Sequence, residues 1–119
     1  MSYLTSNMVT GGVSDQIKIV SLSGSFDRSN ADIIRQKLAE VTAISPAFVI
    51  VNMSRVNFID STGLATLVYG VKQAHNMKGD LRLCGLKSST RIIFELTRMD
   101  KVFEIFLTEQ DAIYSFELP

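Results

Sequence analysis

The sequence predicts an α/β fold: a single domain with a mostly parallel central sheet of four or five strands and about four helices packed on it. Short β-branched apolar runs alternate with segments whose apolar residues recur at helical spacing, in the order β-α-β-α-β-α-β-α. The connections are short, which favours parallel strands joined by right-handed crossovers. With 119 residues, of which 46% are hydrophobic and 20% charged, the chain can bury one core.

The first elements are an arm, a strand and a helix. Residues 1–14 are polar and mixed, and we expect a loose N-terminal arm or an irregular edge strand there, with the main domain over residues 15–119. Alternating apolar residues predict a strand at residues 17–22, ended by a Ser-Gly pair. The Ser-x-x-acid spacing from Ser29 to Asp32 is typical of a capping box and predicts a helix, which ends before a Ser-Pro pair.

The central strand and helix enclose a polar cluster. The apolar run at residues 48–53 predicts a strand covered on both faces. A helix ending near Gly79 follows, and its buried stripe is expected to contain Leu64, Leu67, Val68, Val71 and His75. Asp60, Ser61 and Thr62 therefore lie where the carboxyl end of a strand meets a helix N-terminus. Function in α/β folds commonly sits at this edge.

The last third of the chain repeats the alternation. Residues 81–86 predict a strand, in which Cys84 is expected to fill the core. Residues 102–107 predict a short strand, and a last helix opens at Glu109 and carries three apolar residues. Between these strands we expect a helix capped by Ser88 to Thr90, with a buried stripe of Ile92, Leu96 and Met99 and with Ile93 beside it.

Composition excludes several classes of function. Twelve basic residues balance twelve acidic ones, which argues against nucleic acid or an anionic membrane as the main partner. No apolar run reaches the roughly 18–20 residues of a membrane span. The start of the chain lacks the pattern of a secretion signal, so a cytoplasmic location is expected. One cysteine and one histidine make a disulfide or a zinc site improbable, and no metal or cofactor is expected.

The residues for enzyme chemistry are missing. The nucleophile motif Gly-x-Ser-x-Gly and the glycine-rich phosphate loops do not occur, and His75 is expected to pack rather than to act as a base. We therefore predict that the chain is not an enzyme. From the residues alone, an ordinary helix cap is the favoured interpretation of Asp60 to Thr62. The alternative is that Ser61 accepts a phosphate, because a helix N-terminus favours added negative charge.

The segment from Val49 to Leu64 resembles the signature of STAS domains, and more narrowly that of bacterial anti-sigma factor antagonists. This pattern is an apolar strand, Asn or Asp, a variable turn, aromatic-apolar-Asp-Ser-Ser/Thr-Gly-Leu, and then a helix. Residues 22–27, 91–97 and 102–106 also resemble the family, and the match covers about residues 14–117. One departure is Arg98, which stands where the family often has glycine, and it puts the end of the third helix in question.

The resemblance implies a partner switch. The unmodified domain would bind an anti-sigma factor that is also a serine kinase, and so free a sigma factor. The kinase would phosphorylate Ser61, the phosphorylated form would dissociate, and a metal-dependent serine phosphatase would restore it. ATP and Mg²⁺ belong to the kinase, so no cofactor is implied, and a monomer is expected. The alternative is a STAS interaction module of another signalling or transport assembly with no sigma-factor role; a nucleotide-binding protein ranks last.

A partner surface is expected around Ser61. Thr62, Thr66, Tyr69 and Gln73 share one face of the predicted helix, which we expect to be open to a partner. The placement of the loop after the first predicted strand is expected to bring Asp27 near Asp60 and Ser61. Phosphorylation is expected to change the surface charge there without refolding the domain. The full set of candidate partner-binding residues is Asp27, Asp60, Thr62, Gly63, Thr66, Tyr69 and Gln73.

Overall fold

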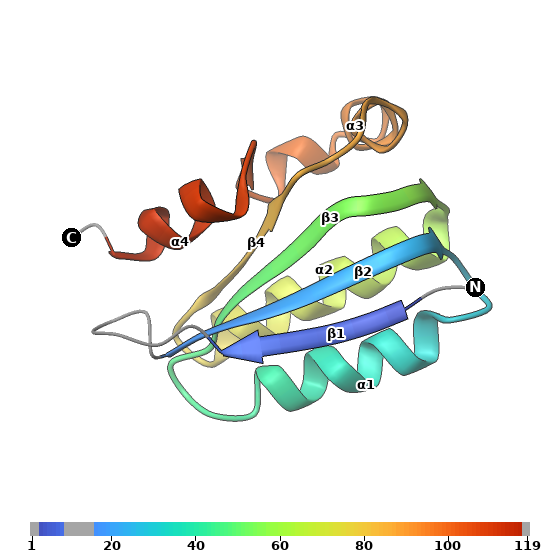
Figure 1. Ribbon diagram of the computed structural model, residues 1–119. Coiled ribbons are helices and arrows are strands. Elements are labelled where there is room, and N and C mark those ends of the chain that lie inside the picture. Colours follow the sequence, from blue (N-terminus) through green and yellow to red (C-terminus); the bar gives the residue numbers. More distant parts are fainter. Residues whose placement is uncertain (1–2, 9–15, 118–119) are drawn as a thin grey trace.

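A five-stranded sheet in the order β1-β2-β3-β4-β5 forms the centre of the molecule (Figure 1). The computed structural model describes residues 3–8 and 16–117, and side chains only within 16–117. The strands β2 to β5 are parallel, and β1 pairs with β2 in antiparallel orientation. Their bounds are β1 Tyr3–Met8, β2 Ile17–Phe26, β3 Phe48–Ile59, β4 Asp80–Cys84 and β5 Ile105–Phe106. The predicted α/β class is confirmed, and residues 3–8 form an edge strand; the expected domain boundary at 14/15 lies outside the described residues.

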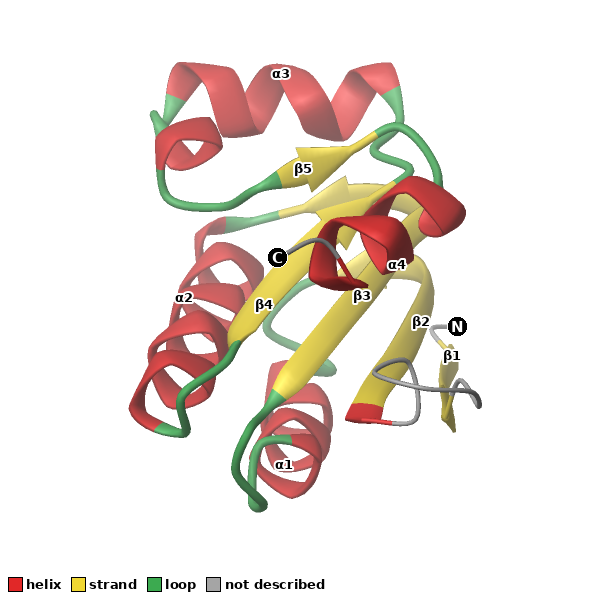
Figure 2. Ribbon diagram, turned by 90° about the vertical axis from the view of Figure 1, so that its left-hand side faces the viewer, coloured by secondary structure: helices red, strands yellow, loops and turns green. Residues whose placement is uncertain are grey.

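Helices cover both faces of this sheet. The helices α1 and α2 lie side by side on one face, and α4 lies on the other (Figure 2). The helix α3 contacts β3 and is followed by a short 3₁₀ turn. Their bounds are α1 Ala31–Val41, α2 Ser61–Asn76, α3 Ser88–Leu96, the 3₁₀ turn Met99–Lys101 and α4 Glu109–Glu117.

The two faces bury separate apolar clusters. The larger cluster joins the sheet to α1, α2 and α3 and includes Val49, Val51, Leu81 and Leu83. The smaller one packs α4 on the sheet and consists of Ile17, Ile19, Ile50, Cys84, Ala112 and Ile113. The thiol of Cys84 is fully buried, as predicted, and burial, reinforced by the charge of Glu109, raises its pKa to about 12. A thiol in this state is a core group and not a nucleophile.

The two central strands are longer than predicted. The strand β2 continues to Phe26 and β3 to Ile59, whereas the sequence suggested ends at residues 22 and 53. Both extensions contain register shifts, and Gly24 within β2 has a φ of +82°. Bulges interrupt the apolar alternation while the strands remain paired. The extension of β3 leads directly into α2, so only Asp60 separates them.

The third helix turns a different face to the core than expected. The predicted stripe is wrong, because Ile92 and Leu96 are 53% and 76% exposed. Thr90 and Phe94 are buried instead. The ring of Phe94 packs edge-on against Phe103, with the centroids 5.9 Å apart. An aromatic ring buries more area than a single aliphatic side chain, and this contact sets the rotation of the helix.

The helix ends differ from the predicted caps. Asn30, not Ser29, precedes α1, and its side chain makes no cap bond. The residue in left-handed conformation after α2 is Lys78, with φ +61°, and not Gly79. Gly79 is required for another reason, because a Cβ there would lie 1.8 Å from the carbonyl oxygen of Ala47. Arg98, the departure from the family pattern, has φ +63°.

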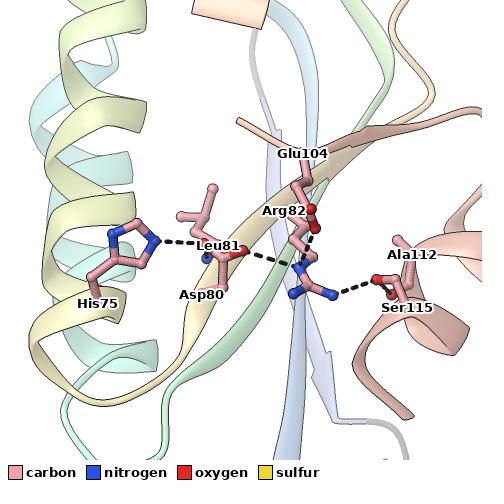
Figure 3. A network of polar contacts seen from close by, with 7 residues as sticks. All are labelled: His75, Asp80, Leu81, Arg82, Glu104, Ala112 and Ser115. Atoms are coloured by element: carbon pink, nitrogen blue, oxygen red, sulfur yellow. Dashed lines mark hydrogen bonds and ion pairs between the residues drawn. The ribbon is translucent and has the colours of Figure 1, made fainter. Parts of the chain in front are cut away.

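A polar network joins α2, β4 and α4 at the far end of α2 from Ser61 (Figure 3). His75 was expected in the buried stripe, but its side chain is 58% exposed and its Nε2 lies 2.9 Å from Asp80 Oδ1. Arg82 Nε lies 3.0 Å from Asp80 Oδ2 and 3.1 Å from Glu104 Oε2. Its Nη1 donates to Ser115 Oγ of α4 at 2.7 Å. The network therefore fastens α4 to the sheet.

Candidate functional site: the N-terminus of α2

Asp60 caps α2 and holds the neighbouring loop. Its Oδ1 accepts a hydrogen bond from Gly63 N at 2.9 Å, and its Oδ2 accepts one from Arg28 N at 3.3 Å. Its own backbone N–H donates to Phe26 O at 3.3 Å. Gly63 is buried against β2, where a Cβ would lie 2.6 Å from the same Phe26 oxygen. The start of α2 is therefore fixed to the end of β2.

The loop after β2 presents a second carboxylate beside the first. Asp27 Oδ1 accepts hydrogen bonds from the hydroxyl of Ser29 and from Ser29 N, the latter at 2.9 Å. These two bonds lower the pKa of Asp27, and the bond from the hydroxyl has the larger effect. Asp27 is thus held as a carboxylate. Asn30 Oδ1 accepts from Asp27 N, which fixes the loop. Asp27 and Asp60 border one open depression of about 430 Å³, together with Arg28, Ser29 and Phe58.

Ser61 is the first residue of α2 and is exposed. Among the described residues, none forms a hydrogen bond with its hydroxyl. The first backbone N–H groups of a helix have no partner within the helix, and they carry the positive end of the helix dipole. An exposed hydroxyl at such a position can accept a phosphoryl group without moving the core.

An apolar depression lies on the other side of Ser61. It has a volume of about 360 Å³ and runs between α2 and the segment after α3. The start of α2 thus borders two hollows, a polar one at Asp60, where Arg28 accompanies the two carboxylates, and an apolar one at Ser61. The apolar hollow is lined by Ser61, Leu64, Ala65, Val68, Thr97 and Met99.

Comparison with known proteins agrees with this geometry. The STAS domain family matches residues 11–112. The chain belongs to the STAS-domain family. It is 30% identical over 114 residues to the anti-sigma-F factor antagonist RsfB of Mycobacterium tuberculosis, covering 95% of this chain and 92% of that protein. It is 27% identical over 103 residues to the putative anti-sigma factor antagonist BtrV of Bordetella bronchiseptica, covering 87% and 89%.

A solved structure shows the same fold. The anti-sigma factor antagonist of Mycobacterium paratuberculosis has a TM-score of 0.85 to this chain at 25% identity, covering 99% of this chain and 96% of that one. By sequence and structure, this STAS domain is thus homologous to anti-sigma factor antagonists, a family of binding proteins. In the described part of the chain, no helix has the length and apolar character needed to cross a bilayer.

The STAS domain brings some of the predicted site residues together and separates others. Asp27, Asp60 and Ser61 gather at one edge, as the loop placement suggested. Thr66, however, is only 5% exposed, and its hydroxyl donates to the carbonyl of Thr62 at 2.8 Å. The expectation that this face of the helix is open is therefore wrong at Thr66.

Tyr69 lies toward α1, and Gln73 is hydrogen-bonded to Tyr69. The Arg35 guanidinium of α1 is stacked 3.8 Å from the centroid of the Tyr69 ring. Gln73 Nε2 donates to Tyr69 Oη at 3.4 Å. Both side chains are half-buried. They support the contact between α1 and α2, and the outward face of α2 is made of other residues.

Sequence reasoning missed the apolar part of the site. Phe58 is 52% exposed and lines the polar depression, and Ala65 and Val68 line the apolar one. Val68 was assigned to the buried stripe, as was Leu96 of α3. One signal in the sequence could have found this surface. Thr90 and Phe94 are also at helical spacing, and a buried stripe made of these two residues leaves Leu96 exposed to solvent.

Proposed function

We propose that this STAS domain is an anti-sigma factor antagonist controlled by phosphorylation of Ser61. Its unphosphorylated form binds an anti-sigma factor with serine kinase activity and releases a sigma factor. Phosphorylation ends this binding, and a serine phosphatase restores it. The domain acts in the cytoplasm as a monomer and without a cofactor of its own. The exposed Ser61 hydroxyl at the start of α2, to which no described residue is bonded, carries the proposal, supported by the homology to antagonists.

Charge explains the loss of binding. A phosphoserine adds about −1.5 to −2 charges at neutral pH. These charges would add to those of Asp60, the preceding residue, and of Asp27, which borders the same depression as Asp60; Arg28, the one basic residue that lines this depression, offsets only part of them. A partner surface shaped for a hydroxyl would then face repulsion and lost solvation. A loss of about 2.7 kcal/mol corresponds to roughly a hundredfold weaker binding.

The fold accommodates the phosphate. Ser61 is exposed, and the hydroxyl has no bond to a described residue that phosphorylation would break. Asp60 accepts from Gly63 N, and the remaining N–H groups at the start of α2, with the helix dipole, favour the added charge. The switch is therefore one of surface charge, and the phosphorylated domain keeps its secondary structure and packing.

The kinase docks on the apolar depression and not on the face of α2 that carries Thr66. Ser61 itself lines this depression, so a partner that reaches the hydroxyl must cover its neighbours. Leu96, which precedes the lining residue Thr97 in the chain, is 76% exposed. Exposed apolar groups beside a modification site provide the desolvated centre that protein interfaces need. Asp27, Asp60 and Thr62 form the polar border, and Gly63 acts by holding the helix start in place.

Phosphate mapping tests the proposal. The protein is incubated with Mg-ATP and each anti-sigma kinase from its own genome, and the product is mapped by mass spectrometry. One phosphate on Ser61 is expected, retained in the matched variant Thr62→Ala and lost in Ser61→Ala. Calorimetry with the same kinase should show roughly a hundredfold weaker binding of the phosphorylated form.

Two results would contradict the proposal. Phosphorylation of Ser61→Ala at the wild-type rate would place the modification elsewhere. Equal affinity of both forms for the kinase would leave a constitutive interaction module, the alternative reading of a STAS domain. Far-ultraviolet circular dichroism of each variant confirms that a lost phosphate does not reflect unfolding.

A further inference from the structure

A polar cleft lies on the face of the sheet that α4 covers only in part. The helix α4 contacts β3, β4 and β5 (Figure 2). Asn52 of β3 faces this side, because its Nδ2 donates to Glu109 Oε1 of α4 at 2.9 Å. Beside it is a cleft of about 250 Å³ that is separate from the depressions at Ser61. Its lining residues are Ser21, Leu22, Asn52, Ser54 and Arg55.

A bulge turns Arg55 toward this cleft. Between the pairs Ser21–Asn52 and Ser23–Arg55, β3 has one residue more than β2. Regular alternation would place Arg55 on the same face as Met53, which is fully buried in the core. Instead Arg55 and the residue before it are both exposed. Bulges that redirect a side chain in this way are common beside binding sites.

The cleft carries donors that no described residue uses. Asn52 is fixed on both sides, since its Oδ1 also accepts from Ser54 N at 2.9 Å. The guanidinium of Arg55 and the hydroxyls of Ser21 and Ser54 form no hydrogen bond or ion pair within the described part of the chain. Leu22 has its side chain in the opposite core, so its backbone forms the floor.

We propose that this cleft binds a small oxyanion, either free phosphate or a small phosphate monoester. The guanidinium of Arg55 supplies the charge and a planar pair of donors that matches two phosphate oxygens. The hydroxyls of Ser21 and Ser54 supply further donors on neighbouring strands. The volume is below the roughly 300–1,000 Å³ of pockets for drug-sized ligands, which matches an ion or a small monoester. This site is independent of Ser61 and of the proposed partner switch.

Titrations followed by ¹H–¹⁵N correlation spectra test the site. Inorganic phosphate and glycerol 3-phosphate are added in parallel at constant ionic strength. Saturable shifts are expected at the amides of Ser21, Leu22, Ser54 and Arg55. The variant Arg55→Met should bind about tenfold more weakly or not at all, because a charge-assisted contact is lost. Lys72→Met, which removes an exposed positive charge on α2, should bind as the wild type does.

The two ligands distinguish the source of the phosphate. Tighter binding of glycerol 3-phosphate indicates a monoester whose organic part fills the cleft, and equal binding indicates the free ion. Unchanged affinity in Arg55→Met overturns the proposal. Shifts that do not saturate, or that are spread over the surface lysines, also overturn it. The spectrum of each variant without ligand shows whether it is folded.

Discussion

Replacing Asp60 separates its role as a helix cap from its charge. In Asp60→Ala, Gly63 N loses its acceptor at 2.9 Å and Arg28 N loses its acceptor at 3.3 Å. Loss of an N-cap side chain costs about 0.5–2 kcal/mol, typically near 1. The second bond is exposed and long, and it adds about 0.5 kcal/mol. The free energy of unfolding should therefore fall by about 1–2 kcal/mol.

Urea denaturation measures this loss, and Asp60→Asn is the matched control. Asparagine keeps an oxygen in the same position but carries no charge, and it caps helices about as well as aspartate. With a slope near 1.5 kcal/mol per molar urea, Asp60→Ala should shift the midpoint down by about 1 M. Asp60→Asn keeps the bond from Gly63 N but turns its NH₂ group toward Arg28 N, so it loses only the second bond and should shift the midpoint down by about 0.3 M. Equal losses in both variants would refute the cap, since they would assign the stabilisation to the negative charge at the helix dipole.

Three further predictions follow from backbone geometry and charge. Gly79→Ala should lower the free energy of unfolding by about 2 kcal/mol or more, because the added Cβ would meet backbone atoms of Ala47 that cannot move aside. A loss under about 0.5 kcal/mol in urea denaturation would contradict this. Arg98→Gly should raise stability by about 0.5–1 kcal/mol by relieving the left-handed strain, and an unchanged melting temperature would argue against such strain. The Asp27 carboxyl should titrate below 3.8 in NMR pH titrations and return toward 3.8 in Ser29→Ala. Because the pKa of Asp27 is lower in the folded state, the contribution of Asp27 to stability is present above pH 3.8 and disappears as the pH falls through the folded pKa. If Asp27 had the same pKa in Ser29→Ala as in the wild type, the hydroxyl would be excluded as the cause.

The sequence identified the position of the site more accurately than its surface. Asp60 and Ser61 lie at the strand-to-helix junction as predicted, because the ends of both elements are encoded locally by apolar period and cap residues. The approach of Asp27 to Asp60 was also anticipated, since parallel neighbours end at the same edge of a sheet. The docking face was not anticipated, because nothing local indicates that α1 packs on α2 and places Arg35 over the Tyr69 ring.

The errors in the predicted fold also come from contacts between distant segments. Leu96 and Phe94 both fit a helical stripe, and only the position of Phe103, brought back by the chain after α3, decides which one is buried. His75 fits the apolar stripe of α2 by spacing, but Asp80 at the start of β4 holds it at the surface. Periodicity specifies that a helix has a buried face, while the partner elements select the residues.

The sequence by itself determined the α/β class, the order of the elements and the Asp-Ser-Thr-Gly junction, because these depend on residues close together in the chain. Only the tertiary structure decided the bulges of β3, the rotation of α3 and the hollows on either side of Ser61. Each of these results from contacts between segments distant in sequence. Their energies depend on packing and burial, which a local pattern does not contain.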